Sequence, residues 1–309
     1  MGHSLPVHGR TMPASTPPHL RPDHKGSIML AEASLFYLAL LLAWGWSEHW
    51  SVANGKMALQ QGVLTLSLLA PLALRRYRSD PFIVTVLGTT AGLIVFSQLA
   101  AAFSYMITST NAPLFDATLA RWDHNLGFDW VDFSNWSARY PLLDLSLQAA
   151  YDSLLPQMVL LVLFLAWTGR FRLLSDFCGT LVVCKMMADL VSGFYPAMGA
   201  SKYYAQLLRT DVSMLSDFEP LRSGALRSID LVALQGLIVA PSFHAILALL
   251  LIVATRGTKL AWPYLLLNLW MLLATPKFGG HYLVDLLAGA LTVLLASLLW
   301  QRHITSKYA

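Results

Sequence analysis

Two histidines and an aspartate in the last third of the chain have the types and spacing of a nucleophilic or acid–base site. His244 follows Pro-Ser-Phe at the start of an apolar stretch, and His281 follows two glycines and precedes Asp285 by four residues. Four residues make about one helical turn, so the Asp285 carboxylate can accept a hydrogen bond from one imidazole nitrogen of His281. The other nitrogen keeps its lone pair, and an imidazole oriented in this way can act as a nucleophile or a base.

The composition places these residues in a membrane protein. The 309 residues are 56% hydrophobic and only 12% charged, with a mean hydropathy of +0.55, whereas soluble chains carry roughly 25% charged residues. A soluble two-domain enzyme is therefore excluded. The net charge of +4 does not indicate nucleic-acid binding, because no basic run with interleaved aromatic residues occurs. We expect the bilayer as a partner and no nucleic acid.

Eight apolar segments are long enough, or nearly so, to cross about 30 Å of hydrocarbon as helices. The sequence thus predicts an all-α polytopic bundle with transmembrane helices near residues 28–46, 57–74, 82–106, 145–168, 172–195, 235–255, 260–275 and 281–301.

Basic residues in alternate connections orient this bundle. Arginines cluster at residues 75–78 and 170–172, and loops on the cytoplasmic side retain Lys and Arg. Both termini are therefore expected in the cytoplasm. The two helices that carry His244 and His281 then begin at the same outer face of the membrane, where free N–H groups at helix starts favour an anionic ligand.

The remaining segments divide the first half of the chain. Residues 1–27 are rich in Pro, Ser, Thr and His and are predicted to form a disordered cytoplasmic tail. Residues 28–106 would form three accessory transmembrane helices. Residues 107–144 mix aromatic and acidic side chains, which is typical of an external segment lying on the membrane surface.

The two histidine motifs together resemble those of the membrane-bound type 2 phosphatidic acid phosphatase (PAP2) superfamily. Its second signature, usually Pro-Ser-Gly-His, is similar to Pro-Ser-Phe-His at 241–244, with Phe for Gly as in the inositol phosphorylceramide synthase-like branch. Its third signature ends in a histidine followed four residues later by an aspartate, which is similar to His281 and Asp285. The resemblance implies a six-helix catalytic core over residues 145–301.

The chain departs from the family where phosphate-binding cations usually stand. Of the first signature, a Lys and a later Arg-Pro, only Pro196 remains, and Ala274-Thr275 replaces the Ser-Arg of the third. Transfer of a phosphoryl group needs compensating charge. Candidate phosphate-binding residues on the outer side, each of which could instead be an ordinary loop charge or helix cap, are Arg222, Arg227, Lys277, Lys202 and Ser242.

The resemblance implies an integral membrane lipid phosphatase, in a bacterial inner membrane, that hydrolyses a lipid phosphomonoester or diphosphate. His281 would form a phosphohistidine, His244 would protonate the leaving alcohol and then activate water, and Asp285 would hold the tautomer of His281. A phosphotransferase that moves a phospho-headgroup between lipids, as in inositol phosphorylceramide synthase-like proteins, is the alternative. A non-catalytic lipid transporter is a third, disfavoured because no inverted repeat is evident. No cofactor or metal is required by these residues.

Other polar residues have competing interpretations. Lys185 and Asp189, four residues apart in the fifth apolar segment, are predicted to form a structural ion pair, with a supporting role at the site as the alternative. Cys178 and Cys184 are predicted to be buried thiols. One acidic group is open to a metal site or, as we favour, to helix caps in an aromatic belt: Asp116, Asp123, His124, Asp129 and Asp132.

Overall fold

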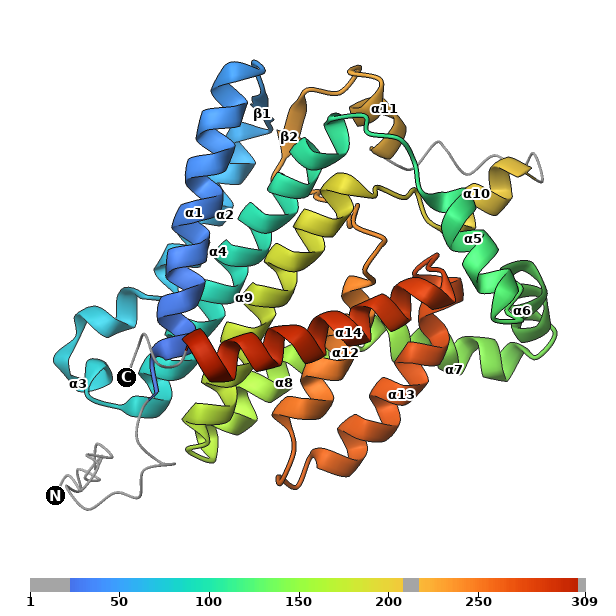
Figure 1. Ribbon diagram of the computed structural model, residues 1–309. Coiled ribbons are helices and arrows are strands. Elements are labelled where there is room, and N and C mark those ends of the chain that lie inside the picture. Colours follow the sequence, from blue (N-terminus) through green and yellow to red (C-terminus); the bar gives the residue numbers. More distant parts are fainter. Residues whose placement is uncertain (1–22, 208–216, 305–309) are drawn as a thin grey trace, which may run out of the picture.

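The computed structural model describes residues 23–207 and 217–304, and most of the predicted N-terminal tail lies outside them. The chain is mostly helical (Figure 1). The α-helices are α1 (Lys25–Ser47), α2 (Gly55–Ser67), α3 (Arg75–Arg78), α4 (Pro81–Ser109), α5 (Asp116–Asn125), α6 (Trp130–Ala138), α7 (Pro141–Asp152), α8 (Leu154–Trp167), α9 (Phe171–Phe194), α10 (Ala200–Leu207), α11 (Phe218–Arg222), α12 (Phe243–Ala254), α13 (Ala261–Phe278) and α14 (Leu283–Leu299). Shorter elements are β1 (Ser51–Ala53), β2 (Ser228–Asp230), the 3-10 turn η2 (Ala70–Ala73) and the π-helical turn η4 (Trp300–Ile304).

Within the described residues, four helices are long and apolar enough to cross a membrane: α1, α4, α9 and α14, the last continued into η4. The pair α7 and α8 is a fifth candidate, bent by 47° at its break. These helices are compatible with an integral membrane protein, but the predicted count of eight spans is not confirmed. The other three predicted segments form α2, α12 and α13, with 13, 12 and 18 residues.

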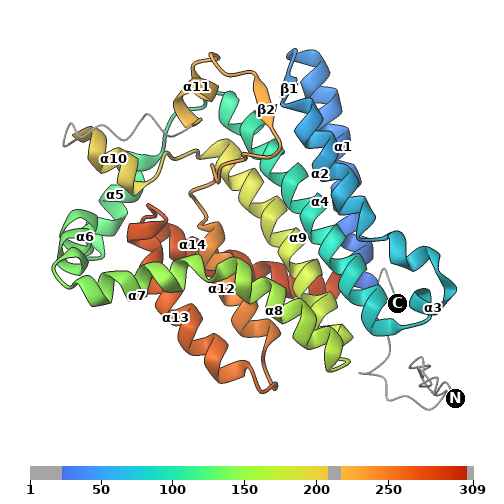
Figure 2. The ribbon, with the colours of Figure 1, turned by 180° about the vertical axis from the view of Figure 1, so that it is seen from behind.

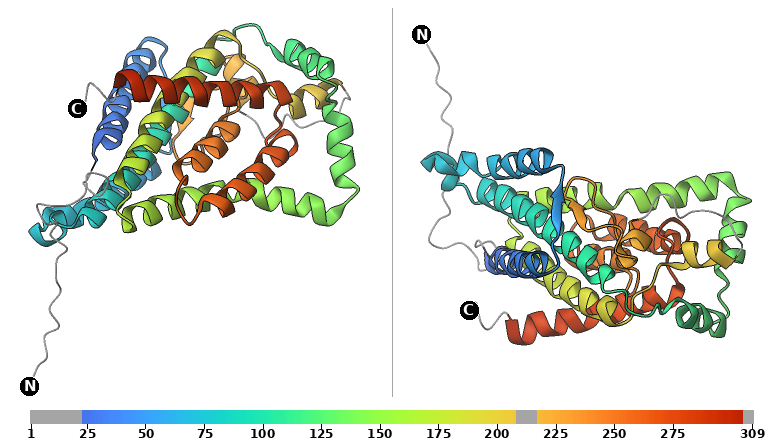
Figure 3. Two further views of the ribbon diagram at one scale, coloured as in Figure 1. Left: turned by 60° about the horizontal axis from the view of Figure 1, so that its bottom comes forward. Right: turned by 90° about the horizontal axis from the view of Figure 1, so that it is seen from above.

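The helices form two neighbouring groups. The accessory helices α1 and α4 pack along α9 (Figure 1), and all three pairs are in contact. On the other side of α9, α12 and α13 lie between α14 and the α7–α8 pair (Figure 3). Seen from behind, α7 and α8 run past α13 and α12 (Figure 2). Leu181 of α9 and Ile246 of α12 belong to one buried apolar cluster that joins the two groups.

One end of the bundle gathers the start of α1, the start of α9 and the end of α14. The backbone N–H of Gly26 donates to the Ser175 hydroxyl at 2.8 Å, and the Trp300 indole donates to Asp176 at 2.8 Å. A Cβ on Gly179 would stand 2.3 Å from the Trp300 ring, so glycine is needed for this close approach. His281 lies just before the opposite end of α14.

A buried polar network fastens the accessory helices to α9. The Lys185 ammonium donates to Asp189 at 2.5 Å and to the Ala100 carbonyl of α4 at 3.0 Å. The Tyr37 hydroxyl of α1 donates to the other Asp189 oxygen at 2.5 Å. Every oxygen of the carboxylate is therefore paired, as burial of charge requires. The predicted Lys185–Asp189 pair is present and joins three helices.

Two smaller features complete the fold. β1 and β2 pair in parallel, with Ser51 opposite Ser228, so a strand that follows α1 joins the long connection before α12. This short sheet is a departure from the predicted all-helical class, and sequence periodicity cannot reveal pairing of three-residue strands.

Cys178 and Cys184 are both free and buried, as predicted.

Candidate active site

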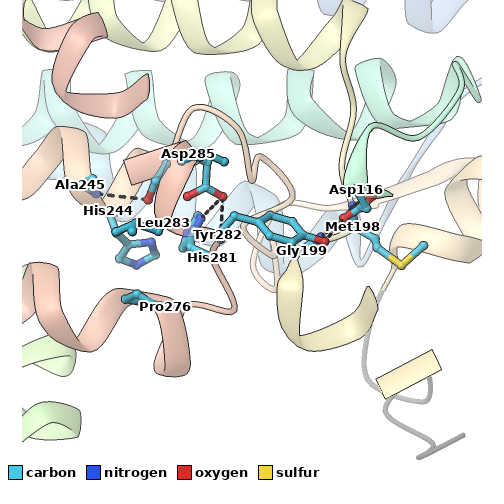
Figure 4. A network of polar contacts seen from close by, with 12 residues as sticks. Asp116, Met198, Gly199, His244, Ala245, Pro276, His281, Tyr282, Leu283 and Asp285 are labelled. Atoms are coloured by element: carbon cyan, nitrogen blue, oxygen red, sulfur yellow. Dashed lines mark hydrogen bonds and ion pairs between the residues drawn. The ribbon is translucent and has the colours of Figure 1, made fainter. Parts of the chain in front are cut away.

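The structure brings His244, His281 and Asp285 together. The two imidazole rings lie with their centroids 5.8 Å apart at 64°, in an edge-to-face arrangement. Nδ1 of His281 is 3.2 Å from an Asp285 carboxylate oxygen, and both side chains are almost completely buried. Figure 4 shows the Asp285 carboxylate joined to His281 by a dashed line, with the His244 ring to one side of His281. Among the described residues, Nε2 of His281 has no hydrogen-bond partner, so its lone pair is available once Nδ1 carries the proton.

His244 begins α12 and is held by an aromatic residue of α7. The Tyr151 ring stacks on the His244 ring with centroids 4.6 Å apart at 25°, and its hydroxyl is 3.4 Å from Nδ1 of His244. The Ser242 hydroxyl accepts the backbone N–H of Ala245 at 3.3 Å and so caps the start of α12. The ring and the cap together fix where the imidazole stands.

Gly279 allows the His281 and Tyr151 rings to lie close to its backbone. A Cβ at this position would lie 2.6 Å from Cδ2 of His281 and 3.2 Å from the Tyr151 ring. Neither ring could keep its position beside a larger residue. Close packing of the two rings therefore explains why this position is glycine. The sequence shows only two adjacent glycines here.

Two aspartates, Asp123 of α5 and Asp285 of α14, hold the backbone on which His281 sits. Asp123 of α5 accepts the N–H groups of Leu283 and Val284, each at 2.8 Å, and so caps α14 from another part of the chain. Asp285 accepts the N–H of Tyr282 at 3.1 Å, which closes the first turn. Burial raises the pKa of Asp123, and the two N–H donors counteract this. The helix start is thus fixed by carboxylates from both sides.

Asp116 plays a matching role for the chain after α9. It accepts the N–H groups of Met198 and Gly199 at 2.9 and 3.0 Å, and it accepts the Tyr282 hydroxyl at 2.9 Å, as Figure 4 shows. Gly199, with φ of +99°, packs directly on the Gly280 carbonyl. The α9–α10 connection therefore lies against the His281 turn.

These contacts distinguish a metal site from helix caps for the acidic residues between positions 116 and 132. Asp116 and Asp123 bind backbone N–H groups, and Asp129 caps α6 by accepting the N–H of Asp132 at 2.8 Å. In the part of the chain that the structure describes, no three His, Cys, Asp or Glu side chains cluster as a metal site. The capping interpretation accounts for these carboxylates.

A cavity of about 420 Å³ opens beside the two histidines. His244, His281 and Tyr151 line one part of it, and Lys185 lines another. Most of its wall is apolar and comes from α4, α9 and α12, including Phe96, Ala100, Leu181 and Leu247. Its volume falls within the range of about 300–1,000 Å³ that small-molecule sites occupy.

Three of the predicted phosphate-binding cations make other contacts and do not line this cavity. Arg222 donates to the Ala112 carbonyl at 2.9 Å, and Arg227 donates to the Leu221 carbonyl at 3.2 Å while lying over the Trp50 ring. The Lys277 ammonium is paired with Asp144 and donates to Ser137 at 3.0 Å. The structure does not bring these three side chains to the histidines.

The fourth cation, Lys202 of α10, also lies outside the cavity wall. Its ammonium is over the Phe218 ring at 5.5 Å, and burial lowers its pKa. Ser201, its neighbour, is close to Gly280, because a Cβ on that glycine would meet the Ser201 hydroxyl at 2.3 Å. Lys202 is therefore the chain neighbour of a residue that touches the His281 turn.

Sequence reasoning missed several residues that shape the site. Tyr151 belongs to no motif of the sequence, and Asp123 caps a helix far along the chain rather than one in its own segment. A tyrosine within an apolar segment is a weak signal, and pairing across 160 residues leaves none in a single sequence. Lys185 gave a stronger signal, because ionisable residues within membrane segments are costly and often functional.

A sequence model of the PAP2 superfamily matches residues 117–299, from α5 to the end of α14. The match covers more than half of the chain and includes both histidine motifs, so the protein belongs to the PAP2 superfamily. No curated protein and no solved structure matches the chain. Family membership and the apolar helices together fit a membrane phosphatase-type function.

Proposed function

We propose that the protein is an integral membrane lipid phosphatase that hydrolyses a phosphomonoester or diphosphate of a lipid through a phosphohistidine on His281. One observation carries the proposal: the His281–Asp285 pair and His244 meet at the wall of one largely apolar cavity. A nucleophile, its orienting carboxylate and a second acid–base group stand where an amphipathic substrate could reach them.

The first half-reaction is an in-line displacement at phosphorus. Asp285 accepts a hydrogen bond from the Nδ1–H group of His281, so Nε2 presents its lone pair and attacks the phosphorus atom. The bond from phosphorus to the lipid oxygen breaks, and His244 gives its proton to that oxygen. The products are a phosphohistidine and the leaving group, which is a lipid alcohol from a phosphomonoester or a lipid monophosphate from a diphosphate.

The second half-reaction returns both imidazoles to their starting states. Neutral His244 takes a proton from water, and the resulting hydroxide oxygen attacks the phosphorus atom. The bond between phosphorus and Nε2 breaks, and inorganic phosphate leaves. The stacked Tyr151 ring supports this role, since it keeps His244 in one orientation during both steps.

The phosphoryl charge needs donors, and the start of α12 offers some. The first N–H groups of a helix are unpaired and lie at the positive end of its dipole. Ser242 caps this helix and could also donate its hydroxyl proton to a phosphate oxygen. Among the cations we assign the supporting role to Lys202, because its neighbour Ser201 lies against Gly280 of the His281 turn. Arg222, Arg227 and Lys277 make carbonyl or carboxylate contacts away from the cavity.

We place the site at the outer face of a bacterial inner membrane, with both termini in the cytoplasm. The proximity of the start of α1, the start of α9 and the end of α14 supports termini on one side, opposite the His281 end of α14. The Phe at position 243 supports membership of the inositol phosphorylceramide synthase-like branch.

The test is to trap the covalent intermediate. Purified protein is mixed with a lipid phosphate labelled at phosphorus and quenched in alkali, where phosphohistidine is stable. We expect label on the wild-type chain and on a His124→Ala control, whose histidine is exposed on α5, and none on His281→Ala. Equal labelling of the three proteins contradicts the proposal.

Product analysis in the same experiment separates the alternatives. Free phosphate is the expected product, and a lipid alcohol added as acceptor should change its yield little. Transfer of the label to that alcohol would indicate the phosphotransferase instead. Movement of intact lipid phosphate across vesicles by an inactive His281→Ala variant would indicate the transporter.

A further inference from the structure

We propose that α4, together with α9 and α12, forms a binding site for one hydrocarbon chain of the substrate, and that Ala101 on α4 sets how much chain the site accepts. This inference rests on the proposed function, because it names the apolar part of the lipid phosphate that the histidines would cleave. The segment that matches the PAP2 superfamily begins at residue 117, after α4 has ended. α4 would thus add one wall to a chain site whose other walls, from α9 and α12, lie within the matched segment.

The chemistry of the cavity wall favours a hydrocarbon occupant. Beyond the histidines the apolar wall includes Phe96, Ala101, Met158, Leu181 and Leu247, which lie on four different helices, and residues 236–239 of the connection before α12. Apolar walls of this kind bind ligands by removing hydrocarbon surface from water. When a phosphate lies at the imidazoles, the adjoining part of the ligand must lie against these side chains.

Small residues on α4 make the space. Ser97, Ala100, Ala101 and Ser104 face the cavity one helical turn apart or less. Ala100 is only 1% exposed, and its carbonyl is bonded to Lys185. Ala101 is only half-buried and belongs to the same wall. A larger side chain at Ala101 would therefore enter the cavity without replacing a residue of the buried core.

The wall is held in a fixed register. Lys185 bonds both the Ala100 carbonyl and Asp189, and Tyr37 bonds Asp189 from α1. Phe96, one turn before Ala100, packs edge-on against the Tyr37 ring at 5.9 Å. Since both accessory helices are tied to α9, α4 presents a preorganised surface to the chain.

The experiment compares two substrates and two non-hydrolysable analogues. Turnover is measured with dodecyl phosphate and ethyl phosphate, and binding with dodecylphosphonate and ethylphosphonate by calorimetry. The variants are Ala101→Phe, the milder Ala101→Leu, and Val95→Phe, which adds bulk to α4 at a position outside the cavity wall.

We expect Ala101→Phe to lower the dodecyl-to-ethyl ratio of kcat/KM by about tenfold or more, the change expected when roughly two methylene groups lose their burial. The ratio of the phosphonate affinities should fall in parallel, Ala101→Leu should lie between, and Val95→Phe should match the wild type. Equal effects on both chain lengths, or no wild-type preference for dodecylphosphonate, would overturn the chain site. Normal phosphonate binding without turnover of either phosphate would instead contradict the proposed phosphatase activity.

Discussion

Two buried pairs each join a basic side chain to an aspartate four residues later: His281–Asp285 and Lys185–Asp189. They differ in how many of their polar atoms have a hydrogen-bond partner. In the lysine pair, the Asp189 oxygens are bonded to Lys185 and Tyr37, and Lys185 also reaches the Ala100 carbonyl. In the histidine pair, one Asp285 oxygen has no hydrogen-bond partner among the described residues, and Nε2 of His281 is also unpaired there.

The difference separates a pair that joins helices from a pair that can react. The lysine network fixes the positions of its members, because both Asp189 oxygens and two of the three N–H groups of Lys185 are bonded to protein. An unpaired nitrogen next to an oriented carboxylate costs stability and is retained where chemistry needs it. The same four-residue spacing therefore occurs in a pair that joins helices and in a pair that can react. The hydrogen-bond partners supplied by neighbouring residues make the difference.

The largest effect should come from the reactive pair. Asp285→Asn is expected to lower kcat by about 10³- to 10⁴-fold, because an amide cannot hold His281 in the tautomer that presents a lone pair on Nε2. Phosphate release from a lipid phosphate measures this, and thermal unfolding in detergent should change little. An activity loss of less than tenfold in a folded Asp285→Asn protein would remove the distinction between the two pairs.

The same substitution in the other pair should act on stability. Asp189→Asn leaves the buried Lys185 charge without its carboxylate, and we expect a loss of about 3–5 kcal/mol in the free energy of unfolding. Thermal and denaturant unfolding provide the measurement. The double variant Lys185→Met/Asp189→Asn removes the charge as well and should recover most of the loss. If the double variant is no more stable than Asp189→Asn, the ion pair is not what holds the accessory helices.

A substitution of His244 tests whether this residue is the general acid that works beside the His281–Asp285 pair. His244→Ala is expected to lower turnover by about 10²-fold or more, the scale of general acid–base catalysis. A substrate with an acidic leaving group, such as a nitrophenyl phosphate, needs little protonation, so its first step should be affected much less. Single-turnover release of nitrophenol measures that step. Equal losses for both substrates would argue against His244 as the acid.

The smallest effect concerns the frame around His281. Asp123→Ala removes the acceptor for two N–H groups at the start of α14, and we expect a loss of about 1–2 kcal/mol in stability. Asp123→Asn keeps one oxygen acceptor and should therefore lose less stability. Asp129→Ala at the exposed start of α6 is the matched control. Melting temperatures of the three variants test the ranking, and an Asp129→Ala loss as large as that of Asp123→Ala would contradict it.

Much of the site could be predicted from the chain alone, because its members are close in sequence or carry a recognisable motif. His281 and Asp285 are four residues apart, and His244 follows a proline-serine start of a helix, so local geometry defines each half. The number of spans could not be obtained in the same way. Hydropathy does not reveal that α7 and α8 are bent by 47° or that α12 has only 12 residues.

The residues around the site depended on the tertiary structure. Asp123 meets Leu283 across 160 positions, Tyr151 meets His244 across 93, and Lys185 meets Ala100 across 85. No periodicity or spacing encodes such contacts, since they arise only when helices pack. The predicted cations show the converse, because Lys277 and Arg222 are close to the site in sequence or topology yet bond elsewhere.

The sequence by itself determined an apolar, mostly helical chain with two histidine motifs, since apolar content and short-range spacing are properties of the chain. Only the tertiary structure decided that the motifs converge to a ring separation of 5.8 Å, which carboxylates frame them, and that an accessory helix lines the adjoining cavity. The physical reason is that packing and hydrogen bonding between distant segments fix positions that local preferences leave open.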